Sequence, residues 1–184
     1  MLARYGWSAV MFIPTGLIGQ RGHLTWHDLR QMHASGRWNV GEHGGEGHVL
    51  IAADRAERRL PFYAAKRWNN GTWESFADYK RRVSRDVVRG GALLAGNLAG
   101  WSPRVSFAVP FNNYGQNGSN DRRIAAWLSR WLKKRFAVVF VQRGDSFTTP
   151  GIAFANRIAV GSRWDADALE SHLRRGLGLR SGTR

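Results

Sequence analysis

Met11-Phe12-Ile13-Pro14-Thr15-Gly16-Leu17-Ile18-Gly19 is an apolar run that ends in Pro-Thr-Gly, a pattern typical of a buried strand that leads into a loop. A second stretch, Gly41-Glu42-His43-Gly44-Gly45-Glu46-Gly47-His48, places two imidazoles and two carboxylates among four glycines. Glycines add no side-chain bulk that would keep a ligand away from these groups. Together the two stretches predict a strand-and-loop framework with a candidate metal-binding turn.

The composition fits one folded domain that covers residues 1–184. Apolar residues make up 43% of the chain, with nine Trp and nine Phe, which argues against disorder. The chain has no cysteine, so any metal must be held by His, Asp or Glu.

The chain is strongly basic, with 28 Lys and Arg against 13 Asp and Glu and a formal net charge of +15. Such a charge attracts polyanions in general. It is also typical of solvated helix faces, and the sequence has no RRM-type or zinc-finger pattern. Nucleic acid is therefore not the favoured partner, although an acidic polymer stays open as a ligand.

No apolar run reaches eighteen residues, so no transmembrane helix is predicted. The first residues, Met1-Leu2-Ala3-Arg4-Tyr5-Gly6-Trp7, lack the charged leader, apolar core and cleavage site of a signal peptide. They are typical of the middle of a domain. The location stays open between the cytoplasm and, for a longer protein, the cell envelope.

Strand patterns alternate with helix patterns along the whole chain, which predicts a mainly parallel sheet covered by helices. The predicted strands are residues 8–14, 38–42, 105–109, 136–141 and 157–160. The predicted helices are residues 26–34, capped by Thr25 and stopped by Gly36, a short one at 51–58, a long one from Thr72 that ends before Pro103, one from Asp121, and 165–177.

In such folds functional groups collect in the loops at the carboxyl ends of strands. The glycine-rich histidine loop follows one predicted strand, and residues 111–120, rich in Asn and Gly, follow another. Both loops should therefore lie at the same edge of the sheet, which predicts a site there.

His43 and His48 are the leading candidates for metal ligands, because neutral imidazoles a few residues apart on a turn are a natural pair for a divalent ion. Glu46 between them could add an oxygen ligand. The alternative is a tight glycine turn with solvated histidines. The remaining histidines, His23, His27, His33 and His172, are expected to be structural or exposed.

The segment after Pro110 is the third candidate element. Proline fixes the direction of the chain, so the backbone N–H of Phe111 could point into a cleft and stabilise an oxyanion. Asn112, Asn113 and Tyr114 supply neutral donors and acceptors that suit sugar hydroxyls. The alternative is an Asn-Gly-rich turn that only needs positive φ angles.

Five motifs, in this order along the chain, resemble those of the polysaccharide deacetylases of the NodB-homology type, carbohydrate esterase family 4 and its relatives. They are the strand and Pro-Thr-Gly-Leu-Ile-Gly loop in residues 8–19, the Leu-Thr-Trp helix in residues 24–36, the histidine segment in residues 38–48, Phe107-Ala108-Val109-Pro110-Phe111, and Asn156-Arg157-Ile158-Ala159-Val160.

The resemblance implies a distorted (β/α) barrel and a divalent metal, usually zinc, that is bound by one Asp and two His. His43 and His48 would be the imidazole ligands, and the Phe111 N–H would belong to the oxyanion site. The reaction would remove acetyl groups from an N-acetylated or O-acetylated polysaccharide, because the metal polarises the carbonyl and lowers the pKa of water.

The chain departs from this family at four points. It has no Asp-Asp pair, which in the family comes from a first strand with Thr-Phe-Asp-Asp-Gly, and its histidines are five residues apart where the family usually has four. Val109 stands where many members have Arg, and no Leu-x-His motif follows Arg157.

These departures predict a barrel that is incomplete at its amino end, with a gap beside residues 8–14. The chain would be a fragment or a degenerate member with little or no deacetylase activity, and a version extended upstream through a Thr-Phe-Asp-Asp-Gly strand would be active. The alternative function is a non-catalytic relative that binds carbohydrate or a polyanion.

Overall fold

The computed structural model describes Gly6 and residues 8–103, 105–142, 154–157 and 165–176. Five parallel strands form its central sheet in the order β1 (Ala9–Ile13), β2 (Trp38–Glu42), β7 (Ser106–Ala108), β8 (Val138–Val141) and β9 (Phe154–Asn156). The connections between the first four contain α1 (Trp26–Ala34), α2 (Phe76–Asn97) and α3 (Arg123–Arg135). A further helix, α4, spans Ala166–Gly176.

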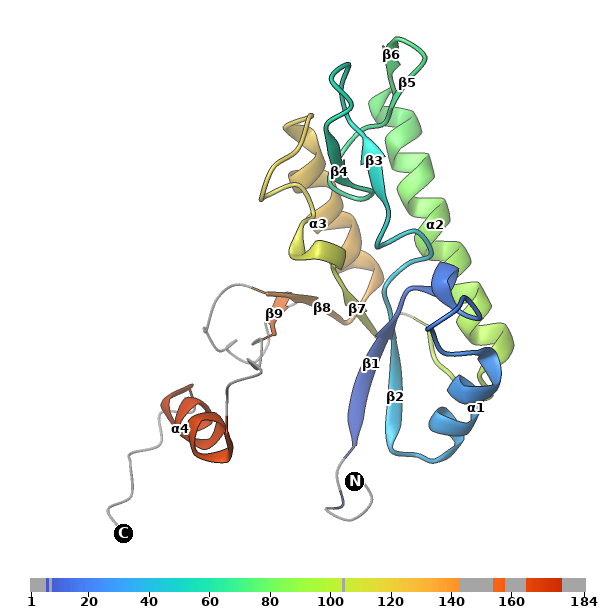
Figure 1. Cartoon of the computed structure of the whole chain (residues 1–184), viewed down its shortest axis with the longest axis vertical. Coiled ribbons are helices and arrows are strands. Elements are labelled where there is room, and N and C mark those ends of the chain that lie inside the picture. The colour runs from blue at the N-terminus through green and yellow to red at the C-terminus, as the bar shows by residue number, and fades with distance from the viewer. Residues whose placement is uncertain (1–5, 7, 104, 143–153, 158–164, 177–184) are drawn as a thin grey trace.

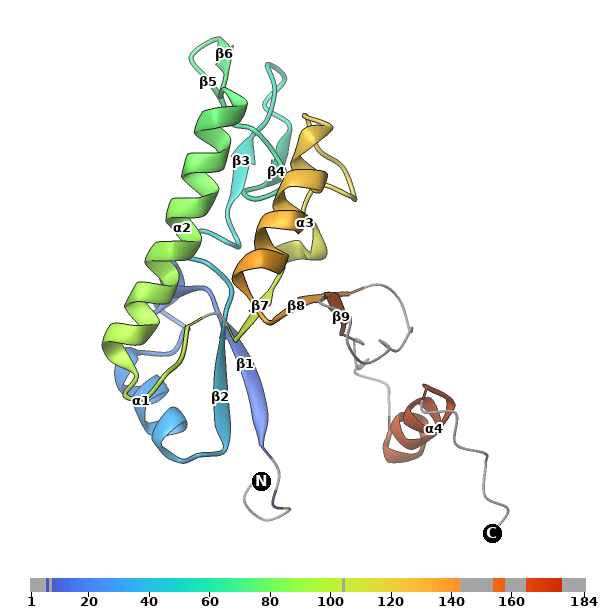
Figure 2. The same cartoon turned by 180° about the vertical axis from the view of Figure 1, so that it is seen from behind.

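The strand order advances in one direction across the sheet, without the reversal of a doubly wound fold. Because parallel crossovers are right-handed, successive helices then lie on the same face, and α1, α2 and α3 do so (Figures 1 and 2). This is the winding of a (β/α) barrel, so the predicted deacetylase-type α/β class is confirmed. Within the described residues the sheet is open, and no strand pairs with the outer side of β1.

Two apolar clusters join the helices to the sheet. The larger one lies under α2 and α3 and contains Tyr79, Val83, Leu128 and Val139. The smaller one lies under α1 and contains Leu29, Val40 and Leu94 among others. The helices contribute side chains to these clusters at three- and four-residue spacing, as Tyr79 and Val83 of α2 do, and this spacing is why the sequence pattern predicted the helices.

The first helix follows its sequence signals closely. Thr25 caps α1, because its hydroxyl accepts from the Asp28 N–H at 3.2 Å and the Asp28 carboxylate accepts from the Thr25 N–H at 2.8 Å. Gly36 follows the helix with φ of +66°. Both signals were predicted, and both are confirmed.

The predicted helix over residues 51–58 is wrong. This segment is an antiparallel hairpin of β3 (Leu50–Ala52) and β4 (Arg59–Pro61). Asp54 forms its turn, since Oδ1 accepts from the N–H groups of Ala56 and Arg58 at 3.0 and 3.1 Å. An Asp side chain that bonds to its own downstream backbone favours a turn over a helix.

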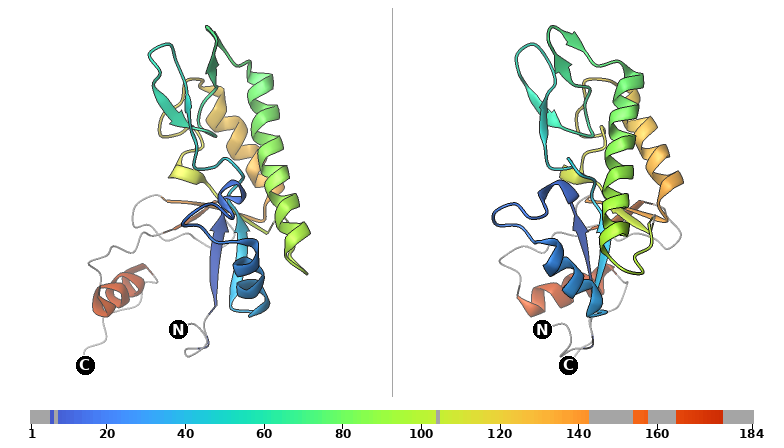
Figure 3. Two further views of the ribbon diagram at one scale, coloured as in Figure 1. Left: turned by 45° about the vertical axis from the view of Figure 1, so that its right-hand side comes forward. Right: turned by 90° about the vertical axis from the view of Figure 1, so that its right-hand side faces the viewer.

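The long helix begins at Phe76, after the Ser75 cap, and not at Thr72. The preceding residues form a second hairpin of β5 (Trp68–Asn69) and β6 (Thr72–Trp73), whose turn is Asn70-Gly71 with positive φ at both residues. Asn-Gly is the preferred pair for such a turn. Both hairpins stand beyond the carboxyl end of the sheet (Figure 3).

The remaining boundaries shift by a few residues. The helix expected from Asp121 begins at Arg123, and the last strand is Phe154–Asn156. The predicted last strand, residues 157–160, does not overlap it: Arg157 follows β9 directly, and residues 158–160 lie outside the described residues. Among the described helices, none is long and apolar enough to cross a membrane.

Candidate functional site

Three loops meet at the carboxyl edge of the sheet. The first contains the 3-10 helix η2 (Thr15–Leu17) after β1, the second is the histidine loop after β2, and the third begins with the 3-10 helix η3 (Pro110–Asn112) after β7. The Thr15 N–H donates to the Gly44 carbonyl at 2.8 Å, so the first two loops are bonded to each other. The parallel sheet therefore assembles the predicted site from segments that are far apart in the sequence.

His43 follows β2 directly and is buried, with 7% of its surface exposed. Its Nδ1 lies 2.6 Å from the Ala108 carbonyl oxygen at the end of β7. Because a carbonyl only accepts, Nδ1 carries the proton, and Nε2 of the neutral ring keeps its lone pair. Burial lowers the pKa of His43 to about 4, and nearby His48 and Arg157 also lower it, so the imidazole is neutral at pH 7.

His48 lies at the far end of the same loop and faces His43. The two Nε2 atoms are 2.9 Å apart, and the ring planes are tilted by 47°. Partial burial lowers the pKa of His48, which also favours the neutral imidazole. On its other side the ring contacts Phe111, with centroids 5.1 Å apart. The structure thus brings the two predicted imidazoles together.

The pair fits two positions of a zinc site. Two nitrogens that each lie about 2.0–2.1 Å from one zinc ion are about 3.3 Å apart at a tetrahedral angle, which is close to the observed separation. Both imidazoles are neutral and converge through Nε2. Within the described residues, however, no group of three or more His, Asp or Glu side chains could hold a metal.

Glu46 is exposed and is not brought to this pair. Its Oε1 lies instead 3.6 Å from the position that a Cβ of Gly16 would take, and its backbone N–H donates to Asp86 at 3.0 Å. In the described conformation Glu46 is therefore not a ligand, and a metal held by His43 and His48 would need further ligands from elsewhere.

Asp86 on α2 holds the histidine loop and was not predicted. Its Oδ2 accepts from the Gly45 N–H and its Oδ1 from the Glu46 N–H, each at 3.0 Å, and the Tyr63 hydroxyl donates to Oδ2. Burial raises the pKa of Tyr63, and the Asp86 charge raises it further, so the phenol stays a donor. The partners are 23 and 41 residues from Asp86, which leaves no local pattern to recognise.

The loop and α2 approach so closely that glycines are required. A Cβ on Gly44, where φ is +74°, would lie 1.7 Å from the Tyr63 hydroxyl oxygen. A Cβ on Gly91 would lie 2.7 Å from Oε1 of Glu42. A Cβ on Gly90 would lie 3.3 Å from both the Gly44 carbonyl carbon and the Thr15 hydroxyl oxygen. Gly90 and Gly91, which lower the helix propensity of α2, thus form the surface of this helix that contacts the site.

Phe111 has φ of +53° and ψ of +13°, a left-handed conformation that is uncommon for a bulky residue. The Asn112 and Asn113 N–H groups bond to the Val109 and Pro110 carbonyls. In the described part of the chain the Phe111 N–H has no such acceptor, and the Phe111 ring is 44% exposed beside His48. The turn at Phe111 is thus strained, and its ring lies beside one of the two imidazoles; the oxyanion role of the N–H stays a prediction.

The predicted sugar-binding side chains hold the loop together. The side-chain amide of Asn112 donates through Nδ2 to the Gln142 carbonyl and accepts through Oδ1 from the Gln142 N–H. The Asn113 Oδ1 accepts from the Gly115 and Asn117 N–H groups at 2.8 and 3.3 Å. Tyr114 is buried and packs on Phe154 with ring centroids 5.4 Å apart. Their polar groups mainly shape the loop.

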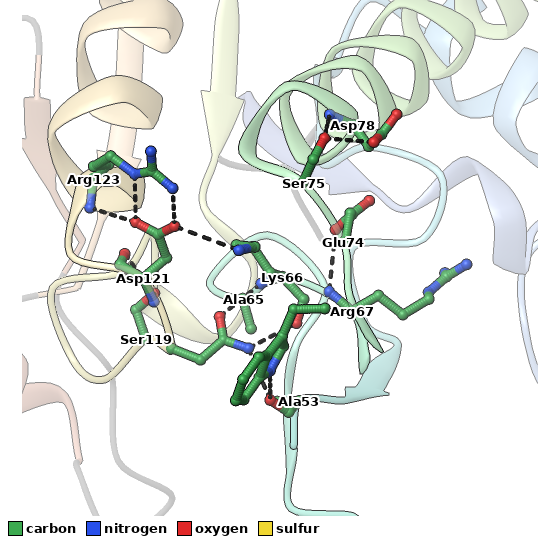
Figure 4. Close-up of polar contacts among 12 residues, drawn as sticks. Ala53, Ala65, Lys66, Arg67, Glu74, Ser75, Asp78, Ser119, Asp121 and Arg123 are labelled. Atoms are coloured by element: carbon green, nitrogen blue, oxygen red, sulfur yellow. Dashed lines mark hydrogen bonds and ion pairs between the residues drawn. The ribbon is translucent and has the colours of Figure 1, made fainter. Parts of the chain in front are cut away.

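The far end of this loop is fastened to the hairpin segments (Figure 4). Asn120 accepts from the Lys66 N–H at 2.8 Å and donates to the Ala53 carbonyl at 2.9 Å. The Asp121 carboxylate accepts from Arg123 and pairs with Lys66, and the Arg123 bond is the main reason that the pKa of Asp121 is about 2. The third loop is thus rigid at both ends.

No family model and no curated protein matches this chain in sequence. Solved structures do match it. A de-N-acetylase from Aggregatibacter actinomycetemcomitans superposes with a TM-score of 0.73 at 18% identity, over 93% of this chain and 67% of that one. The BpsB deacetylase domain from Bordetella bronchiseptica gives 0.67 at 17% identity, over 86% and 63%.

A polysaccharide deacetylase from Bacillus cereus gives a TM-score of 0.58 at 13% identity, over 91% of this chain and 42% of that one. The chain spans about two thirds of the first two structures. Identities this low support a statement about fold only. The order of the strands, the helices on one face and these superpositions agree: the protein has the fold of the polysaccharide deacetylases.

Proposed function

We propose that this site serves the metal-dependent deacetylation of an N-acetylated or O-acetylated polysaccharide. One observation carries the proposal: two neutral imidazoles on one loop have their Nε2 atoms 2.9 Å apart at the carboxyl edge of the sheet. The fold is shared with proteins whose names describe de-N-acetylation and polysaccharide deacetylation, and that chemistry is transferred here as part of the proposal.

His43 and His48 would hold a divalent ion, zinc in the first place. The bound ion would polarise the acetyl carbonyl and lower the pKa of a water molecule. The Ala108 carbonyl fixes the tautomer of His43, so that Nε2 and not Nδ1 is the ligand atom. Glu46 could add a carboxylate ligand only if its side chain turned from Gly16 toward the pair.

The Phe111 N–H would donate to the oxyanion that forms on the carbonyl oxygen. A single donor of this kind typically contributes about 10²–10³ in rate. The exposed Phe111 ring beside His48 offers an apolar face on which a sugar ring can lie. Asn112, Asn113 and Tyr114 would act mainly by holding this turn in its left-handed shape.

Hydrolysis also needs a base that takes the proton of water and an acid that protonates the leaving amine or alcohol. The sequence contains no Asp-Asp pair and no Leu-x-His motif after Arg157, and the described residues place no carboxylate beside the imidazoles. We therefore propose that the chain binds the metal and the acetylated sugar but releases acetate slowly.

Zinc titration of the purified chain by calorimetry tests this proposal. Zinc binding should be lost in both His43→Ala and His48→Ala, and it should be kept in His27→Ala, which removes an exposed imidazole from α1. N-acetylglucosamine oligomers should then bind more tightly with zinc than without it. Zinc binding that survives both substitutions, or an absence of affinity for the oligomers, would refute the proposal.

A further inference from the structure

We infer that Asp86 is a positioning residue that sets the place of His48 through the backbone of the histidine loop. This inference rests on the proposed function for its meaning in catalysis. Its structural part, that one carboxylate on α2 determines the shape of the loop, can be tested without any metal.

The carboxylate bonds to two successive backbone N–H groups, those of Gly45 and Glu46, through separate oxygens at 3.0 Å. Successive N–H groups that point to the same side form a site for an anion. Gly44, with φ of +74°, turns the chain so that both groups face α2. The Tyr63 hydroxyl fixes the carboxylate from a third direction.

The two imidazoles depend on this clamp to different degrees. His43 is buried and has its own anchor, the bond from Nδ1 to the Ala108 carbonyl. His48 is exposed, and the polar and aromatic contacts of its ring within the described residues are with His43 and Phe111. The position of His48 therefore depends on the backbone that leads to it, in which Asp86 holds the N–H groups of Gly45 and Glu46 while the Gly44 and Gly45 carbonyls accept from Thr15 and Gly16.

An amide cannot replace the carboxylate at this position. Asparagine has one acceptor oxygen and one donor NH₂ group, whereas Gly45, Glu46 and Tyr63 all donate to Asp86. Whichever way the amide is turned, its NH₂ group faces a donor, and at least one backbone N–H loses its acceptor. Asp86→Asn should thus loosen the loop although size and shape are unchanged.

The test compares Asp86→Asn with Asp78→Asn. Asp78 lies on the same helix, and its exposed carboxylate bonds to Ser75 and Arg81, away from the loop. Both variants lose one negative charge, so the comparison separates the clamp from the change in net charge. The first measurement is amide hydrogen exchange at Gly45 and Glu46 by NMR, and the second is zinc affinity by calorimetry.

We expect exchange at Gly45 and Glu46 to be at least about tenfold faster in Asp86→Asn, and zinc affinity to fall by about 10–100-fold, as for other partners that orient metal ligands. Both quantities should be unchanged in Asp78→Asn. Unchanged exchange and affinity in Asp86→Asn would overturn the inference. If the parent chain does not bind zinc while exchange still rises only in Asp86→Asn, the clamp stands and the proposed function falls.

Should Asp86→Asn not fold, Tyr63→Phe carries the same test. It keeps the carboxylate and removes only the hydroxyl that fixes it. Faster exchange at Gly45, whose N–H shares Oδ2 with this hydroxyl, supports the clamp, and unchanged exchange overturns it.

Discussion

Acid should destabilise the metal-free protein through His43, because the folded state holds this imidazole neutral. Burial lowers its pKa from 6.5 to about 4. Between these two values the unfolded chain binds a proton that the folded chain does not, so the free energy of unfolding falls as the pH falls. Each pH unit in this window removes about 1.4 kcal/mol, and the whole window about 3 kcal/mol. Below about pH 4 the loss is complete.

Urea unfolding in the presence of a chelator, at a series of pH values from neutral to about pH 4, measures this loss. The comparison is with His43→Asn, whose δ-amide lies where Nδ1 of the ring is, so it can still donate to the Ala108 carbonyl but cannot take up a proton. Other titrations are common to both proteins and cancel in the difference. The parent should lose about 3 kcal/mol more than the variant. Parallel pH curves would show that the environment of His43 is not as described.

Three further outcomes are expected. Gly91→Ala should lower the free energy of unfolding by about 1–3 kcal/mol because its Cβ meets Glu42, whereas Gly96→Ala, with open space on the same helix, should raise it by about 0.5–1 kcal/mol; urea unfolding measures both, and equal effects would contradict the close approach. Arg82→Met should cost about 1.5–3 kcal/mol in the same assay, because the half-buried Glu74 carboxylate loses its guanidinium partner and keeps only the Arg67 N–H among its described partners, and a loss under about 0.5 kcal/mol would contradict that value. Purified protein with zinc should release little or no acetate from N-acetylglucosamine oligomers, and rapid release that His43→Ala abolishes would reveal a carboxylate that the described site lacks.

Much of the fold could be predicted because it follows from periodicity. The apolar runs that became β1, β2, β7 and β8 stood between amphipathic helices, and this alternation admits few architectures other than a parallel sheet. Elements whose signals are local, such as the Thr25 cap of α1, came out at the predicted residues. The predictions were wrong where a turn competed with a helix: the segment around Asp54 is a hairpin and not a helix, and the long helix begins at Phe76 and not at Thr72.

One part of this error could have been avoided. Asn70-Gly71 between two short segments is a strong hairpin signal, and it indicates that Thr72 belongs to a strand and not to the start of the long helix. The turn at Asp54 is different, because Asp, Ala and Arg are all compatible with a helix. Its outcome is decided by bonds from the Asp54 carboxylate to backbone N–H groups, and composition does not reveal them.

Some residues of the candidate site could also be predicted from the sequence, and others could not. His43, His48 and Phe111 could be placed together because each follows a parallel strand, and such loops share one edge of the sheet. The internal use of Asn112 and Asn113 is one of two alternatives that the sequence left open, since an amide next to glycines serves a turn as readily as a sugar. The role of Asp86 could not be predicted either, because its partners Gly45, Glu46 and Tyr63 lie far from it in the sequence.

The glycine pair of α2 shows how such a contact could be recognised. Gly90 and Gly91 lie inside a helix, where each costs about 0.5–1 kcal/mol relative to alanine, and neither ends the helix, which continues to Asn97. Asp86 lies one turn before Gly90, and all three residues contact the segment from Glu42 to Gly45. Two adjacent glycines within an amphipathic helix therefore indicate a place where the backbone of a loop packs directly against the helix. An acidic residue four positions before the first glycine then indicates a carboxylate that accepts from the N–H groups of that loop. The cost in helix propensity persists because alanine at Gly91 would displace Glu42, the residue that immediately precedes His43, and with it the imidazole pair.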